Sequence, residues 1–76
     1  MIIKVLGSGC ANCKKLEANV HKALEQSGIS ATVEKVTELK DIMQYGVMST
    51  PALVVDEVVK SSGRLLSPVD IIKLIS

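Results

Sequence analysis

The chain has 76 residues, of which 47% are hydrophobic and 22% are charged, and its formal net charge is +1 at pH 7. This balance is typical of a globular domain and excludes an intrinsically disordered chain. Tyr45 is the only aromatic residue, and lysines alternate with glutamates, so the sequence offers neither a stacking platform nor a basic stripe for nucleic acid or an anionic membrane.

The first part of the chain predicts a strand, a long helix and a second strand. Ile2–Leu6 is short, β-branched and followed by glycine and serine, which indicates a buried strand that runs into a turn. Across Ala11–Ser27 the apolar residues recur at steps of three and four, and Gly28 stands where a helix C-terminal glycine belongs. Residues 31–36 alternate between apolar and charged and form the second strand. This succession predicts a parallel pair with a right-handed crossover.

A short helix is expected next. Thr37 can cap it, and Leu39, Ile42 and Met43 would then point inward before Gly46 ends the helix.

A hairpin follows the short helix. Pro51 cannot donate to a ladder from the middle of a strand, so it should stand just before a third strand at Ala52–Val55. A fourth strand is expected at residues 58–60. The intervening Asp56 and Glu57 indicate a tight turn, although this pair is not one that such turns favour.

The chain is expected to end in a helix after a loop at residues 61–63. Ser67 is the predicted cap, Pro68 stands at the first helical position, and Asp70 lies in the first turn. The expected buried residues of this helix are Ile71, Ile72, Leu74 and Ile75. Together these elements form a single domain over residues 1–76, which we expect to be a monomer.

The expected compartment is the cytoplasm. No apolar stretch is long enough to cross a membrane, and the N-terminal residues lack the pattern of a signal peptide. A close pair of cysteines in that reducing compartment is more often catalytic or metal-binding than structural.

Both cysteines lie in the stretch GSGCANCKKLEANV, where the glycine turn passes into the first helix. Cys13 precedes Leu16 and Val20 by three and seven positions, so it faces inward, whereas Cys10 stands at the helix cap or just before it. The free N–H groups and the positive end of the helix stabilise a thiolate at Cys10, and the two following lysines add positive potential. The positions therefore predict one exposed, reactive sulfur and one buried sulfur.

The spacing alone leaves other uses of this pair open. A structural zinc site needs four ligands, and the only histidine, His21, lies roughly 12 Å along the helix from Cys13. The stronger alternative is a soft-metal clamp by Cys10 and Cys13, because GSGCANC resembles the G-x-x-C-x-x-C loop of copper metallochaperones, where two thiolates hold Cu(I). The two cysteines could also be inert small hydrophobic residues.

The rest of the chain favours a different family. Metallochaperones usually have Met where this chain has Ser8, and they end in a strand. The order strand with Cys-x-x-C, helix, strand, helix, Thr-Pro, hairpin and helix resembles the thioredoxin fold in its smallest, glutaredoxin-like form. The start of the chain is similar to that of the small prokaryotic thioredoxin-like proteins called redox-active disulfide proteins.

This resemblance implies an α/β fold of order βαβαββα, with a four-stranded mixed sheet in the order 2-1-3-4 and helices on both faces. The first and last helices should share one face. It also implies a thiol-disulfide oxidoreductase in which Cys10 is the nucleophile and Cys13 is the resolving thiol, with a cis Thr50-Pro51 bond facing the pair. The residues expected to contact substrate are Gly9, Ala11, Asn12, Thr50, Pro51, Ser62 and Gly63.

The implied partners are a disulfide-containing substrate protein and an upstream reductase of the thioredoxin-reductase type. Thioredoxins usually carry Trp before the first cysteine and Gly-Pro between the two, where this chain has Gly9, Ala11 and Asn12, so its active-site surface should be more open. Glutaredoxins that use glutathione have a Gly-Gly turn after the hairpin, where this chain has Ser62-Gly63. Glutathione is therefore not expected as a cofactor, and no bound cofactor or metal is expected besides the redox-active disulfide.

Overall fold

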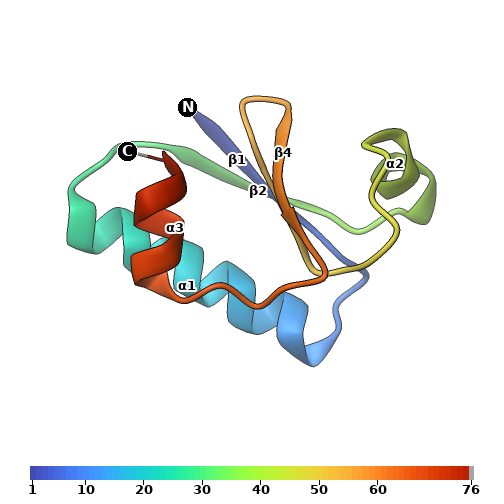
Figure 1. The fold of residues 1–76 in the computed structure, drawn as a ribbon, viewed down its shortest axis with the longest axis horizontal. Coiled ribbons are helices and arrows are strands. Elements are labelled where there is room, and N and C mark those ends of the chain that lie inside the picture. The colour runs from blue at the N-terminus through green and yellow to red at the C-terminus, as the bar shows by residue number, and fades with distance from the viewer. Residues whose placement is uncertain (76) are drawn as a thin grey trace.

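The computed structural model describes residues 1–75 of the chain. These residues fold into a four-stranded sheet with helices on both faces (Figure 1). The elements are β1 (Ile2–Leu6), α1 (Ala11–Ser27), β2 (Thr32–Val36), α2 (Leu39–Gln44), β3 (Ala52–Val55), β4 (Val58–Ser62) and α3 (Pro68–Ile75). The strand order is β2-β1-β3-β4; β1 is parallel to β2, and β3 is antiparallel to β1 and β4. The predicted element order, strand order and mixed sheet are confirmed.

The central strand β1 contributes to a hydrophobic core on each face of the sheet. Its pleat turns Ile3 and Val5 towards α1 and α3, whereas Leu6 lies on the opposite face with Ile42 of α2. The larger core consists of Ile3, Val5, Leu16, Val20, Ala23, Leu53, Val55, Leu66, Ile71 and Ile75. The smaller core consists of Leu6, Ile42, Ala52 and Val54.

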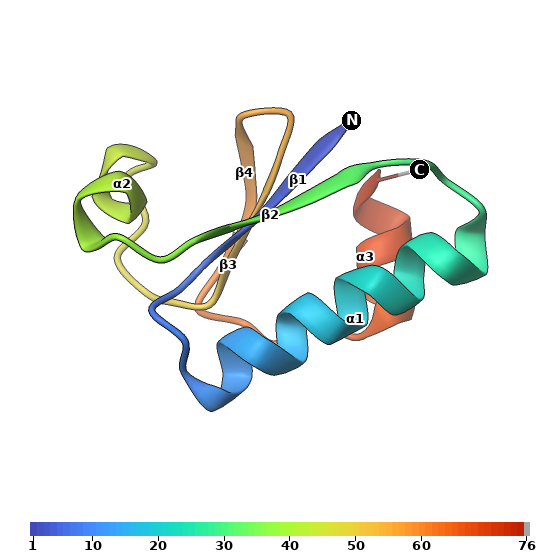
Figure 2. The ribbon, with the colours of Figure 1, turned by 180° about the vertical axis from the view of Figure 1, so that it is seen from behind.

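The helices α1 and α3 lie side by side on one face of the sheet, as predicted (Figures 1 and 2). α1 ends at Gly28, whose φ is 71° and whose N–H donates to the carbonyl of Leu24 at 3.0 Å. Glycine adopts this left-handed conformation without a Cβ penalty. α3 begins at Pro68, and the hydroxyl of Ser67 accepts a hydrogen bond from the N–H of Asp70 at 3.3 Å. The predicted C-terminal end of α1 and the predicted N-terminal end of α3 are therefore confirmed.

α2 is shorter and less buried than its sequence predicts. Its N-cap is Glu38 rather than Thr37, and the Glu38 side chain makes no capping hydrogen bond. Ile42 is 4% exposed, but Leu39 and Met43 are 69% and 64% exposed. A helix of 6 residues has fewer than two turns, so it offers the sheet only a narrow stripe. The expectation that all three residues point inward is wrong for Leu39 and Met43.

The turn between β3 and β4 holds two residues with positive φ, 49° at Asp56 and 68° at Glu57. The tight turn is confirmed, and its geometry costs about 1–2 kcal/mol per residue that is not glycine. Both side chains are anchored to distant parts of the chain. The Asp56 carboxylate accepts the N–H of Ile2 at 2.8 Å, and the Glu57 carboxylate accepts hydrogen bonds from Lys4 Nζ at 2.5 Å and from the Tyr45 hydroxyl at 3.2 Å. These contacts offset the cost of the turn.

β4 is longer than predicted, because it continues through Ser61 and Ser62. These residues pair with Leu53 and Ala52 of β3, so they belong to the ladder rather than to a loop. Residue 31, by contrast, lies outside β2, which begins at Thr32. Because β4 includes these two residues, it ends beside the segment that precedes β3.

The contacts of Glu57 predict an acid-sensitive contribution to stability. The hydrogen bond from Lys4 lowers the pKa of Glu57 below its ordinary value of 4.5. A carboxylate with a depressed pKa stabilises the fold when the pH is above the pKa that the group has in the unfolded chain. This stabilisation is lost as the pH falls through the pKa that the group has in the folded protein. The free energy of unfolding should therefore fall more steeply below about pH 4.5 for the wild type than for Glu57→Gln.

Urea unfolding between about pH 3 and pH 7 measures this difference. Glu34→Gln, which changes an exposed carboxylate on β2, is the matched control and should follow the wild-type curve. Parallel curves for the wild type and Glu57→Gln would contradict the prediction.

Candidate active site

The two cysteines stand where the loop after β1 enters α1. Cys10 is the N-cap residue of α1, with φ −67° and ψ 164°, and its Sγ accepts the N–H of Cys13 at 3.2 Å. A capping side chain satisfies one of the N–H groups that the first helical turn leaves free. The preceding Gly9 has a φ of 87°, which a residue with a Cβ rarely adopts. The predicted position of Cys10 at the helix cap is confirmed.

The two sulfurs form a disulfide and differ in their exposure. The Cα atoms are 5.0 Å apart. Cys10 is exposed, whereas Cys13 is only 6% exposed and lies on the buried stripe of α1 with Leu16 and Val20. The predicted difference in burial is confirmed, and the sulfur of Cys10 is the one that an incoming group can reach.

Gly7 packs directly against Cys13, a contact that the sequence analysis did not anticipate. A Cβ at Gly7 would overlap Cys13 Sγ, lie 3.0 Å from Cys13 Cβ and lie 3.9 Å from the Cβ of Thr50. The N–H of Gly7 donates to the carbonyl of Val36 at 2.9 Å, so the backbone is held in place by β2. A residue without a Cβ is therefore required here, and the only signal in the sequence is a glycine immediately after the strand.

The segment before β3 lies at the same end of the sheet as the cysteines (Figure 1). The Thr50-Pro51 bond is cis, as the resemblance implied, and Pro51 is buried. Gly63 holds this segment from the end of β4: its N–H donates to the carbonyl of Pro51 at 2.9 Å, and a Cβ on it would lie 2.8 Å from the Cβ of Ser49. The cysteine loop, the proline segment and the end of β4 therefore meet.

The residues predicted to contact substrate are exposed, apart from the buried Pro51: Gly9, Ala11, Asn12, Thr50, Ser62 and Gly63. Their contact with substrate stays a prediction.

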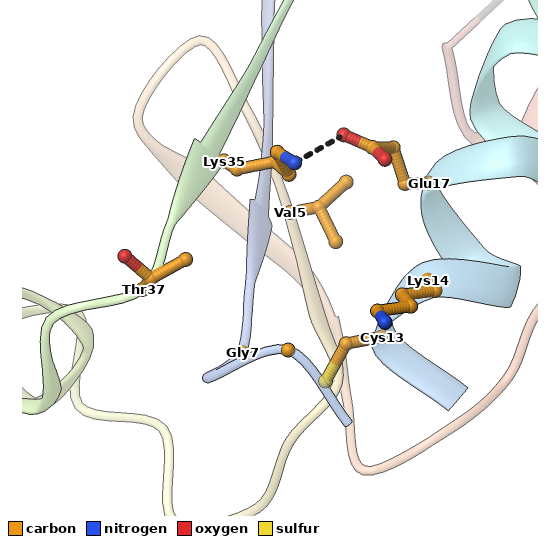
Figure 3. A pocket seen from close by; sticks show the side chains of 8 residues that line it. Val5, Gly7, Cys13, Lys14, Glu17, Lys35 and Thr37 are labelled. Atoms are coloured by element: carbon orange, nitrogen blue, oxygen red, sulfur yellow. Dashed lines mark ion pairs between the residues drawn. The ribbon is translucent and has the colours of Figure 1, made fainter. Parts of the chain in front are cut away.

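A small pocket of about 70 Å³ opens behind Cys13 (Figure 3). Among the described residues, Glu17 is the one carboxylate that lines it, and it forms an ion pair with Lys35 of β2 at 3.7 Å. Glu17 follows Cys13 by four positions on the same helix, so both residues line the pocket; in Figure 3 the Cys13 sulfur points toward Gly7 and the Glu17 carboxylate toward Lys35. The volume is sufficient for a water molecule. The sequence analysis did not single out this pair, although the i, i+4 spacing from Cys13 was visible.

A metal centre is not evident among residues 1–75, because no group of three or more His, Cys, Asp or Glu side chains could hold an ion there. His21 is exposed, and the two sulfurs are joined in a disulfide, whereas a metal binds the thiolate form. Within the same part of the chain, no helix has the length and apolar character needed to cross a bilayer.

The whole chain is similar to known proteins. A family model described as "Thioredoxin domain" matches residues 1–76. A protein named thioredoxin from Methanothermobacter thermautotrophicus is 41% identical over 76 residues, which cover 100% of this chain and 99% of that protein. One of the same name from Methanocaldococcus jannaschii is 36% identical over 67 residues, or 88% of this chain and 77% of that protein. A solved structure described as "Structure of a malarial protein" has a TM-score of 0.70 at 20% identity, covers 97% of this chain and 91% of its own, and supports the fold alone.

The contact between Gly7 and Cys13 predicts that Gly7→Ala is destabilising. The added methyl group would force the sulfur or β1 to move, and overpacking of this kind costs about 1–3 kcal/mol. Urea unfolding of the oxidised protein measures the loss. Ser8→Ala, at the next and exposed position, should change the free energy of unfolding little.

A double-mutant cycle separates the contact from a general backbone effect. In a Cys13→Ala background the sulfur is absent, so Gly7→Ala should cost less than in the reduced wild-type chain, which likewise has no disulfide. Equal costs in the two backgrounds would show that the contact with Cys13 is not the cause.

Proposed function

We propose that this chain, which belongs to the thioredoxin family and is a thiol-disulfide oxidoreductase, acts through a mixed disulfide, with Cys10 as the nucleophile and Cys13 as the resolving thiol. The observation that carries this assignment of roles is the unequal placement of the sulfurs. Cys10 is exposed at the helix cap, and Cys13 is buried one turn further along. Only Cys10 is open to the disulfide of another protein.

The position of Cys10 favours its thiolate. The N–H of Cys13 points at the Cys10 sulfur, and the first turn of α1 has no acidic residue to oppose a negative charge there. The N–H groups and the positive end of the helix interact more favourably with a thiolate than with a neutral thiol. In the dithiol form, Cys10 is therefore the stronger nucleophile of the two.

The reaction then proceeds in two exchanges. The Cys10 thiolate attacks one sulfur of the substrate disulfide, that S–S bond breaks, and the first substrate thiolate leaves. Cys13 loses its proton and attacks the Cys10 sulfur, which forms the intramolecular disulfide and releases the second substrate thiolate. Two electrons have moved from the protein to the substrate, and the upstream reductase must supply two more to convert the Cys10–Cys13 disulfide back to the dithiol.

We propose that Glu17 accepts the proton that Cys13 loses. Both residues line the pocket of about 70 Å³, and Cys13 has little access to bulk water. Lys35 forms an ion pair with the Glu17 carboxylate at 3.7 Å, and in Figure 3 this carboxylate turns toward Lys35, so it would have to turn back toward the Cys13 sulfur to take its proton. A carboxylate that comes within hydrogen-bond reach of the thiol, directly or through one water molecule, can serve as its general base.

The proposed partners are a disulfide-containing protein as substrate and an upstream reductase of the thioredoxin-reductase type as electron donor. The names of the two relatives support both. We further propose that the chain acts in the cytoplasm as a single monomeric domain over residues 1–76 without glutathione, because Ser62-Gly63 replaces the Gly-Gly turn of glutathione-dependent glutaredoxins.

The two cysteines should give opposite results in a trapping experiment. Cys13→Ser keeps the exposed nucleophile but cannot resolve the mixed disulfide, so it should accumulate a covalent complex with a disulfide-bonded protein such as insulin. Cys10→Ser should form little complex and lose reductase activity. In the reduced wild type, a limiting amount of iodoacetamide should label Cys10 before Cys13, and mass spectrometry locates the label.

Equal labelling of the two cysteines without a trapped complex, together with tight Cu(I) binding that either mutation abolishes, would identify the pair as a metal clamp instead.

Glu17→Gln should slow the second exchange and leave the first unchanged. The amide cannot accept the proton of Cys13, and general bases contribute at least about a hundredfold where they act directly. Release of a peptide from its preformed mixed disulfide with Cys10 measures the second step, whereas iodoacetamide labelling of Cys10 reports on the nucleophile. Glu25→Gln, an exposed change further along α1, is the control. A normal release rate for Glu17→Gln would exclude this role.

A further inference from the structure

One side of the exposed Cys10 is cationic. Lys14 and Lys15 lie just beyond the cysteine pair on α1, both are exposed, and neither forms an ion pair within residues 1–75. The first turn of α1 contains no acidic residue, and the nearest carboxylate on the helix, that of Glu17, is already paired with Lys35. Because the whole chain has a formal net charge of only +1, this end of α1 is a local concentration of unbalanced positive charge.

The other side of the site is apolar. Leu39, Met43 and Met48 are 69%, 64% and 99% exposed. These residues, together with Ile42, Val47 and Thr50, line a groove of about 370 Å³. Large apolar side chains gathered on a surface commonly mark a site where another molecule binds, and methionine adapts to partners of different shape. The side chains of α2 that were predicted to be buried, Leu39 and Met43, are therefore part of an apolar surface.

The groove and the disulfide are continuous through Thr50. This residue lines the groove, precedes Pro51, and lies 3.9 Å from the position of a Cβ at Gly7, which itself packs on Cys13. In Figure 1 the segment from α2 to β3 ends beside the loop that enters α1. A segment of another protein that reaches Cys10 and lies along Thr50 would therefore have the lysines of α1 on one side and the apolar groove on the other.

We propose that the preferred substrate is an extended disulfide-bearing segment with acidic residues on one side of its reactive cysteine and bulky apolar residues on the other. The inference rests on the proposed disulfide exchange and adds the substrate class. Charge complementarity with Lys14 and Lys15 fixes the acidic side, and the groove next to Thr50 fixes the apolar side. An extended chain advances roughly 3.3 Å per residue, so the selected positions lie within a few residues of the cysteine.

Peptides of one length, each carrying thionitrobenzoate on its single cysteine, test this proposal through the chromophore that is released. Two peptides have glutamates on one side of the cysteine and leucines on the other, in both orders. Two more peptides keep the order that reacts faster and replace either its glutamates by lysines or its leucines by serines. The reduced protein should react about tenfold or more faster with one glutamate-leucine order than with its lysine counterpart, and this preference should shrink at high salt.

Two double variants assign the preferences to the surfaces. Lys14→Gln with Lys15→Gln should reduce the ratio of glutamate to lysine peptide rates, and Leu39→Ser with Met48→Ser should reduce the ratio of leucine to serine peptide rates. Lys22→Gln on α1 and Val69→Ser on α3 are matched controls at exposed positions outside both surfaces, and they should leave both ratios unchanged. Ratios cancel any general effect on the Cys10 thiolate.

A neutral small disulfide, bis(2-hydroxyethyl) disulfide, separates this inference from the proposed function. If the protein reduces it but reacts with all peptides at equal rates, the substrate preference is wrong and the disulfide exchange stands. If neither the small disulfide nor any peptide reacts, both proposals are wrong. A preference that persists unchanged in the two double variants would also overturn the assignment to these surfaces.

Discussion

The close packing of Gly7 on Cys13 is the contact on which the geometry of the site depends. It joins three parts of the chain that are distant in sequence: the end of β1, the first turn of α1 and the segment around Thr50. The bond from Gly7 to Val36 fixes the backbone on one side, and the buried stripe of α1 fixes Cys13 on the other. With no side chain at position 7, the sulfur of Cys13 occupies the space that a Cβ would fill, while Cys10 stays in solvent at the helix cap.

The sheet positions this contact with few residues. Because β1 is the central strand, both cores pack against it, and the glycine loop that follows it starts from a fixed point. The other end of the sheet is closed by the hairpin turn, whose two carboxylates are held by Ile2, Lys4 and Tyr45. One end of the sheet is therefore stabilised by polar anchors, and the opposite end presents the loops that form the site.

The features that could be predicted from the sequence are those set by local spacing. The burial of Cys13 follows from its distance to Leu16 and Val20, and the position of Cys10 follows from the start of the helix. The contact of Gly7 and the ion pair of Glu17 with Lys35 join different elements, so no local pattern indicates them. The exposure of Leu39 and Met43 escaped prediction for another reason: apolar residues at helical spacing normally pack inward, but a helix of 6 residues offers the sheet only a narrow stripe, which Ile42 occupies.

The short spacing of the disulfide matters for a protein that must alternate between two redox states. The bond joins residues separated by 3 positions, and in the chain-entropy account a cross-link constrains the unfolded chain less as its loop becomes shorter. The burial of the larger core, which brings α1 and α3 onto the sheet, involves neither sulfur. Opening the bond therefore removes a local link at the end of one helix and leaves the main source of stability in place, which allows the same fold to carry both states.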